Sequence, residues 1–294
     1  MPMSDTSESQ PTPQSPQHSS LAQMETPAKA YQTTVHSFPT SSLHRVHYSI
    51  VLAGEQAFVR NIQLALTAWL HAVQGAFEYM WKCRYIHRDI SSNIVLVVDG
   101  RGILSELEYT KKYKGSFKTD GTPHDVQVGT WFYMAVEIAT KEHLFAPGLS
   151  AKRPLDNLLH DLESCWWGVC WQVFSNTSPD DVCNLEEYRE QFDILFPCTI
   201  AVTGGLARGY ILYRGFPHAI YSFRPSSKPL RCKINNLRKT LVGLYEEAYR
   251  PFESGAYEEA NEEIFDTSHV LFTATLAQII PMYPLPKNVA PPIA

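Results

Sequence analysis

The chain has 294 residues, 44% of them hydrophobic and 19% charged, which is enough apolar material for one large domain or two modest ones. Its net charge of −5 provides no global attraction to nucleic acid or to an anionic membrane, so we expect neither as a partner. The six cysteines contain no Cys-x-x-Cys pair, no apolar signal core precedes them, and the most apolar stretch, residues 165–174, is too short to span a bilayer. We therefore expect free thiols and an intracellular location, cytoplasmic or nuclear.

The chain begins with a segment that differs in composition from the rest. Residues 1–42 are rich in Ser, Thr, Pro and Gln and poor in aliphatic residues, so we expect a disordered tail. A strand over 45–52 and a helix over 58–82 follow. The helix is predicted because apolar residues recur three and four apart on one face: Ile62, Leu66, Trp69, Val73, Phe77 and Met80. We expect that face to be core.

The segment after this helix, residues 85–97, places polar side chains between two apolar runs. This pattern predicts a tight loop that leads from a buried segment into a short strand. The polar side chains that can carry or orient charge are His87, Arg88, Asp89, Ser91 and Asn93. Residues 94–98 are predicted as the strand, with a two-residue hairpin turn at 99–100. The return strand ends near Glu106, which by position alone fits a solvated strand end as well as a metal ligand.

The second half of the chain is predicted to be mostly helical. Residues 110–128 are polar and lysine-rich and predict a long mobile loop, in which the candidate phosphorylation sites are Ser116, Thr119 and Thr122. Predicted helices cover 161–174, 180–196, 237–249 and 267–280. The first of these is apolar nearly all round and should be buried. Residues 197–234 are expected to be irregular, and 281–294 form a proline-rich tail.

Four motifs follow one another in an order typical of one family. They are His-Arg-Asp-Ile-Ser from His87, Gly-Ile-Leu-Ser-Glu-Leu-Glu-Tyr from Gly102, Gly-Thr-Trp-Phe-Tyr-Met-Ala-Val-Glu from Gly129, and His-Asp-Leu-Glu-Ser from His160. Over roughly residues 44–175 this set resembles the fungal-type protein kinase family. The resemblance implies an α+β, mainly helical fold. Residues 43–280 would form a protein-kinase-like C-terminal lobe, with the nucleotide-covering N-terminal lobe largely absent.

The resemblance also implies a chemistry, with ATP and Mg²⁺ as cofactors and a protein as substrate or regulatory partner. Asp89 would accept the proton of the substrate hydroxyl, with His87 and Arg88 in the same catalytic motif. Asn93 and Glu106 would hold the magnesium ion.

Three further residues match positions of the kinase pattern. Ser91, two residues after Asp89, would lie with Asn93 at the cofactor. Asp161 would hydrogen-bond the backbone of the catalytic loop, and Glu137 would close the activation segment. Arg88 is expected to pair with a phosphate or an acid in the mobile loop.

Three features depart from the kinase pattern. Only three residues separate Asp89 from Asn93, where kinases have four, and Glu106 stands where kinases have Asp. No Gly-x-Gly-x-x-Gly loop precedes His87, and the only lysine ahead of Lys82 is Lys29. Because phosphoryl transfer depends on positioning and charge neutralisation, we expect weak or absent activity in what resembles a truncated chain.

Two other interpretations remain open. The chain is also compatible with a non-catalytic pseudokinase that acts as a binding or regulatory module. Small-molecule phosphotransferases of the aminoglycoside type share a similar loop and form a weaker alternative. The Gly-Thr-Trp segment at 129–137 and the long loop before it favour protein kinases over these.

Overall fold

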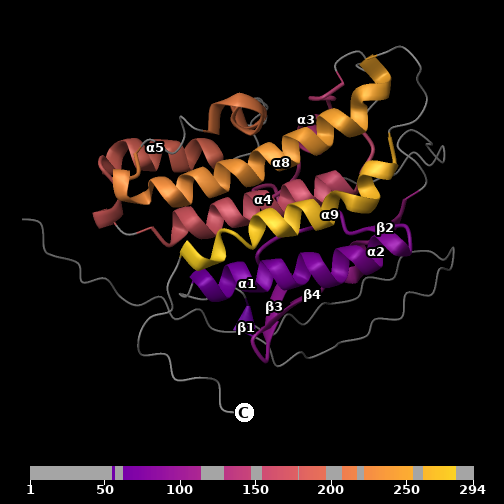
Figure 1. The fold of residues 1–294 in the computed structure, drawn as a ribbon, viewed down its shortest axis with the longest axis horizontal. Coiled ribbons are helices and arrows are strands. Elements are labelled where there is room, and N and C mark those ends of the chain that lie inside the picture. Colours follow the sequence, from indigo (N-terminus) through magenta and orange to yellow (C-terminus); the bar gives the residue numbers. More distant parts are fainter. Residues whose placement is uncertain are drawn as a thin grey trace, which may run out of the picture. The chain divides into compact units, whose positions relative to one another are not determined.

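The computed structural model describes residues 55–56, 62–113, 129–146, 154–177, 179–196, 207–216, 222–253 and 261–282. The chain divides into two units, Met1–Ile50 and Val51–Ala294, and all described residues belong to the second. This unit is mainly helical with a few short strands (Figure 1), as expected for the α+β class predicted. The predicted tail over 1–42, the strand over 45–52 and most of the mobile loop and proline-rich tail lie outside the described residues. No described helix is both long and apolar enough to cross a membrane.

The helix predicted over 58–82 is confirmed from residue 62 onward. It consists of three consecutive pieces: α1 (Ile62–Ala72), the π-helical turn η1 (Val73–Phe77) and α2 (Glu78–Lys82). Of the predicted stripe, Ile62 is partly buried and the next four residues, through Phe77, are buried. Met80 is only partly buried, and the next fully buried side chain is Trp81. A π-turn contains one more residue than an α-turn, so it moves the inward face on by one position.

The hairpin predicted after the polar loop is confirmed. The three-stranded sheet has the order β1-β3-β4, with β1 (Glu55–Gln56), β3 (Val95–Val98) and β4 (Arg101–Leu104). The turn residues Asp99 and Gly100 both have positive φ, 49° and 73°, which is the twist of a type I′ turn. Val98 pairs with Arg101 across the turn. Gly102 lies so close to α1 that a Cβ there would come 1.9 Å from the carbonyl oxygen of Ala68, so only glycine permits this packing.

A second, two-stranded sheet brackets the predicted site. It pairs β2 (Tyr85–Ile86) with β5 (Lys111–Lys112) in antiparallel register. Between these strands the chain runs through the polar loop, the β3–β4 hairpin and the 3-10 turn η2 (Leu107–Tyr109). The pairing therefore brings the start of the polar loop and the start of the predicted mobile loop side by side.

Of the helices that follow, the first and shortest was not predicted, and the longer ones are close to those predicted, with shifted ends. They are α3 (Val136–Thr140), α4 (Leu158–Ser175), α5 (Leu185–Leu195), α8 (Lys228–Glu253) and α9 (Glu263–Leu276). The shorter turns are η4 (Pro179–Asp181), η5 (Ile211–Gly215), η6 (Pro225–Ser227) and η7 (Ile280–Met282). Asn157 and Asn184 set where α4 and α5 begin, since each side-chain oxygen accepts backbone N–H groups of the first turn. The irregular segment predicted over 197–234 is wrong in part, because residues 207–216 are helical and α8 begins at Lys228.

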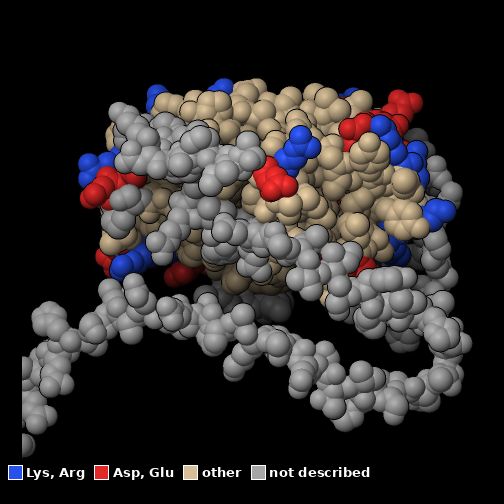
Figure 2. Space-filling model, turned by 90° about the horizontal axis from the view of Figure 1, so that it is seen from below, with Lys and Arg blue, Asp and Glu red and all other residues tan. Residues whose placement is uncertain are grey.

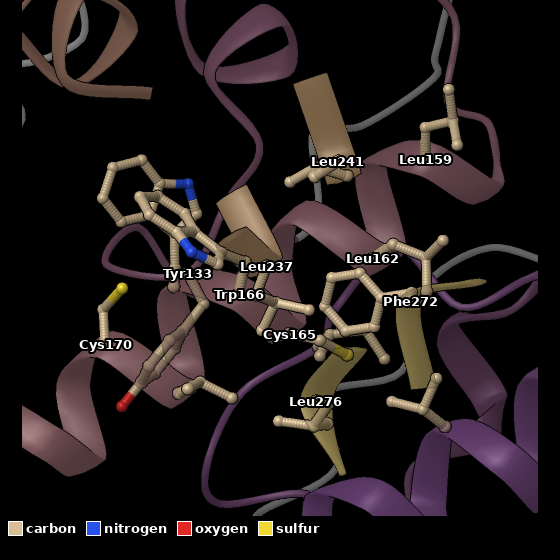
Figure 3. Close-up of a cluster of buried hydrophobic side chains, with 14 of the residues drawn as sticks. Tyr133, Leu159, Leu162, Cys165, Trp166, Cys170, Leu237, Leu241, Phe272 and Leu276 are labelled. Carbon is tan, nitrogen blue, oxygen red and sulfur yellow. The ribbon is translucent and has the colours of Figure 1, made fainter. Parts of the chain in front are cut away.

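The core is organised around α4, which is buried along almost its whole length. In Figure 1, α8, α4, α9 and α1 lie alongside one another, and α4 contacts the other three. Figure 3 shows how Cys165 and Trp166 of α4 meet Leu237 of α8 and Phe272 and Leu276 of α9. A helix that is apolar all round needs neighbours on every side, and here three helices supply them.

The surface carries charges of both signs. On the face shown in Figure 2, acidic and basic side chains of described residues lie next to one another at several places.

Candidate catalytic loop

The polar loop begins where β2 ends, and its backbone is held by α4. The two carboxylate oxygens of Asp161 accept the backbone N–H of His87 at 2.7 Å and that of Arg88 at 2.9 Å. This is the contact that the kinase resemblance implies. Arg88 has φ 76°, a left-handed conformation that a non-glycine residue adopts only when its surroundings hold it there. Burial raises the pKa of Asp161, while the charge of His87 and the two backbone hydrogen bonds act in the opposite direction.

His87 is fully buried and connects the loop to the end of β4. Its Nε2 lies 3.0 Å from the carbonyl oxygen of Ser105, and its Nδ1 accepts the backbone N–H of Asp89 at 3.4 Å. His87 thus helps to orient the backbone at Asp89.

Asp89 is hydrogen-bonded to the segment that begins at Gly129. Its Oδ1 accepts the backbone N–H of Thr130 at 3.0 Å and the Thr130 hydroxyl at 3.3 Å. Gly129 permits this approach, because it has φ 138° and a Cβ there would lie 3.2 Å from the carbonyl oxygen of Arg88. The structure therefore brings together the first and third sequence motifs.

The serines of the loop hold its second half. Ser91 Oγ accepts the backbone N–H of Asn93 at 3.3 Å, and the hydroxyls of Ser92 and Tyr133 are 2.8 Å apart. Both serines are buried, whereas Asn93 is exposed. Ser91 therefore shapes the turn that presents Asn93, and no described contact holds the Asn93 side-chain amide.

Glu106 follows β4 and lies near Asp89 without a hydrogen bond to it. It has φ 58°, and the residue is exposed. Desolvation raises the pKa of the Glu106 carboxyl, and the negative charges of Asp89 and Glu108 raise it further, against the opposing effect of His87. Carboxylates that repel one another in this way would be stabilised by a bound cation.

The oxygen donors near the loop fit magnesium more than a resident structural metal. Among the described residues, no group of three or more His, Cys, Asp or Glu side chains is placed to hold a metal ion. Magnesium, however, is commonly bound by one or two protein oxygens together with the phosphates of a nucleotide. The amide of Asn93 and the carboxylate of Glu106 are donors of that kind.

Arg88 has an acidic partner, Asp156, outside the loop predicted over 110–128. Its Nε donates to the carboxylate of Asp156 at 2.9 Å, and both side chains are largely buried. Asp156 precedes the Asn157 cap of α4. The contact of Arg88 with a phosphate or acid of the mobile loop, which the sequence suggested, falls outside the described residues.

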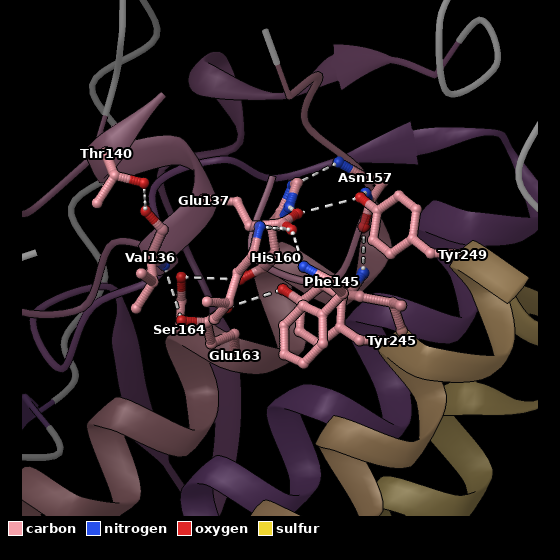
Figure 4. Close-up of polar contacts among 12 residues, drawn as sticks. Val136, Glu137, Thr140, Phe145, Asn157, His160, Glu163, Ser164, Tyr245 and Tyr249 are labelled. Carbon is pink, nitrogen blue, oxygen red and sulfur yellow. Dashed lines mark hydrogen bonds and ion pairs between the residues drawn. The ribbon is translucent and has the colours of Figure 1, made fainter. Parts of the chain in front are cut away.

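Glu137 is the centre of a buried polar network (Figure 4). Its Oε1 accepts the backbone N–H groups of Leu144 and Phe145 at 2.6 and 3.1 Å. Its Oε2 accepts the hydroxyl of Tyr249 at 3.1 Å and lies 3.2 Å from Nε2 of His160. Burial alone would raise the pKa of Glu137, but the hydrogen bond and charge of His160 and the backbone donors outweigh it, so this pKa lies below its usual value.

A second buried carboxylate, Glu163, extends this network. It accepts the backbone N–H of Val136 at 2.8 Å, the indole N–H of Trp167 at 3.0 Å and the hydroxyl of Tyr245 at 2.8 Å. Glu137 and Glu163 together link α3, α4 and α8. The end of the 129–137 segment is therefore fixed to the core by charge as well as by apolar packing.

Sequence reasoning missed several residues of this arrangement. Thr130, His160 and Glu163 belong to the motifs named above but were not assigned to the site, and Arg208 lies outside every motif. The signal available for Glu163 was an acidic residue inside an apolar helix, which requires a partner. No pattern in the sequence pointed to Arg208, because its contacts lie more than 70 residues away.

Comparison with known proteins agrees with these motifs. The family model described as fungal protein kinase matches residues 3–173, more than half of the chain. The match begins well upstream of the first quoted motif and includes most of the segment that composition assigned to a disordered tail. A search of curated proteins found no match. The polar loop, the 129–137 segment and most of α4 all lie within the matched residues, and the chain belongs to the fungal protein kinase family.

Proposed function

We propose that the chain is a phosphotransferase of the protein kinase type, in which Asp89 accepts the proton of a protein hydroxyl as phosphate is transferred from ATP. The observation that most supports this proposal is the way in which the Asp89 carboxylate is hydrogen-bonded. Both hydrogen bonds from Thr130 go to Oδ1, and no described residue hydrogen-bonds Oδ2. One oxygen is thus fixed, and we assign the other to the proton of the substrate hydroxyl.

This arrangement suits a positioned proton acceptor. Thr130 orients the carboxylate through neutral donors, while Asp161 fixes the backbone on the N-terminal side of Asp89. The orientation therefore exists before a substrate arrives, which is the condition under which a general base is effective.

Magnesium and ATP are the cofactors we propose for this site. Asn93 and Glu106 would hold the magnesium ion, and Ser91 would keep the Asn93 backbone in place. When bound, the metal neutralises charge on the transferring phosphate. The chain itself supplies the oxygen donors and the oriented carboxylate.

We expect the transfer to be slow. The loop between Asp89 and Asn93 is one residue shorter than in the kinase pattern, and Glu106 is one methylene longer than the usual Asp. A misplacement of about 1 Å can already cost about a hundredfold in rate. Kinases commonly turn over at about 1–100 per second, and this chain should lie well below that range.

The test is a transfer assay with radiolabelled ATP, magnesium and a mixture of casein and histone as acceptors. Asp89→Asn should abolish the labelling, because an amide cannot accept the proton. Asp99→Asn is the matched control, since Asp99 lies in the exposed hairpin turn, where asparagine is well tolerated. Labelling of equal size in the Asp89 variant, or no labelling by any protein, would contradict the proposal.

A non-catalytic binding module is the second candidate. It is favoured by Asn93, whose position depends on a shortened loop closed by the Ser91 side chain. In that case magnesium and ATP would leave the unfolding temperature unchanged, and none of the three proteins would transfer label. A stabilisation by magnesium–ATP that is lost in Asn93→Ala would argue against it.

A further inference from the structure

Arg208 is fully buried and lies outside the set of residues to which the proposed chemistry assigns a role. Its Nη1 donates to the carbonyl oxygen of Trp131 at 2.9 Å. Its Nη2 donates to the carbonyl oxygens of Phe132 at 3.0 Å and Met134 at 3.2 Å. The guanidinium also lies 4.0 Å from the ring centre of Trp167. All its described hydrogen bonds therefore go to the main chain of one segment, residues 129–137.

A buried arginine is costly, because the guanidinium loses its hydration. Burial lowers the pKa of Arg208 to about 10, with the charge of Glu163 acting in the opposite direction, so the group remains protonated at neutral pH. An apolar side chain of similar volume would fill the same space without this cost. The specific contribution of Arg208 therefore lies in the carbonyl groups that it holds.

The amide groups of the same segment are held by acidic side chains, whose charge is opposite to that of Arg208. The N–H of Thr130 donates to Asp89, and the N–H of Val136 donates to Glu163. Acidic side chains thus bind the amides near both ends of the segment, while a basic side chain binds the carbonyls between them. The three charged residues come from different parts of the chain: the polar loop, α4 and the helical residues 207–216.

We propose that Arg208 is a positioning residue that holds Thr130 against Asp89. By binding the carbonyls of Trp131 and Phe132 it fixes the main chain next to Thr130, and Thr130 in turn orients the Asp89 carboxylate. The proposal concerns the geometry of residues 129–137 and is independent of whether phosphate is transferred.

The test compares Arg208→Met, which removes the charge, with Arg208→Lys, which keeps it but loses the forked geometry. The control is Thr273→Val, which also removes a buried donor. The Thr273 hydroxyl donates to two carbonyls in α9, those of His269 and Val270. Amide hydrogen exchange is measured at Thr130 and Val136, below the unfolding transition, together with the global stability of each protein.

Arg208→Met should speed exchange at Thr130 about tenfold or more, and Arg208→Lys should restore part of the protection. Thr273→Val should leave exchange at Thr130 unchanged. The proposal is overturned if exchange at Thr130 in Arg208→Met stays within about twofold of wild type, or if Arg208→Met and Thr273→Val change it equally. If Arg208→Met fails to fold, exchange at Thr130 is compared between the wild type and Arg208→Lys instead. Rapid exchange at Thr130 in the wild type, or an unchanged rate in the lysine variant, would overturn it as well.

Discussion

Asp161 shows how a single side chain determines the conformation of the polar loop. It is buried, and each of its carboxylate oxygens accepts a backbone N–H, from His87 and from Arg88. In Asp161→Ala both donors would be left buried without an acceptor. We expect this to lower the free energy of unfolding by about 1–3 kcal/mol, measured by urea denaturation.

The control for this substitution is Asp193→Ala. Asp193 is exposed on α5, so its loss should change the stability by no more than about 0.5 kcal/mol. Equal stability of Asp161→Ala and wild type would show that the loop backbone does not need this acceptor.

At the scale of residues, the sequence predicted the parts that belong to recurring motifs. Asp89 and Asp161 were recognised because their neighbours in sequence form such motifs. Thr130 donates its own backbone N–H to Asp89, and Arg208 binds carbonyl groups that are distant in sequence. Hydrogen bonds made by the backbone leave no trace in the identity of the residue that supplies the backbone group. Such contacts become visible only when the fold is known.

At the scale of elements, two glycines in long helices should respond oppositely to alanine. Gly168 of α4 lies against α1, where a Cβ would come 2.5 Å from the Trp69 ring. Gly243 of α8 is exposed, and a Cβ there would meet nothing within 4 Å. We expect Gly168→Ala to destabilise by about 1–3 kcal/mol through overpacking. Gly243→Ala should stabilise by up to about 1 kcal/mol, because alanine has the higher helix propensity.

Urea denaturation of the two variants side by side distinguishes packing from propensity. Helix propensity alone would stabilise both, so a stabilised Gly168→Ala would contradict the close approach of α4 and α1. A destabilised Gly243→Ala would contradict the open surroundings of Gly243 on α8.

The element ends show where periodicity stops being informative. The apolar stripe predicted the helix before the polar loop, but not the π-turn at Val73–Phe77 that places Trp81 inward instead of Met80. Residues 207–216 have little apolar periodicity, yet they are helical. Tertiary contacts there, including those of Arg208, outweigh the local pattern.

At the scale of the whole molecule, the buried charges make stability depend on pH. Glu137 is fully buried and accepts hydrogen bonds from α4, α8 and the turn after α3. Burial opposes its ionised form, yet the contacts with His160 and the backbone donors lower the pKa of Glu137 below its usual 4.5. A carboxyl whose pKa is lowered by folding stabilises the folded state above its unfolded pKa. That stabilisation is lost as the pH falls through the folded pKa.

Glu137→Gln removes this titration and places an amide among four donors. At pH 7 we expect the variant to be less stable by about 3–5 kcal/mol, because a buried charge pair is broken. The difference from wild type should shrink once the pH falls below about 4.5, as wild-type Glu137 becomes protonated. Asp161 and Glu163, whose pKa values burial raises, favour folding at low pH instead, but both proteins contain them and their effects cancel in the difference. His160 does not cancel, because contact with Glu137 raises its pKa; its part of the difference is complete once the pH is below about 6.5 and remains until Glu137 is protonated. The difference in the free energy of unfolding is measured by urea denaturation of both proteins from pH 7 to about pH 3.5. A difference that stays constant over this range would show that Glu137 does not bind as a carboxylate in the folded state.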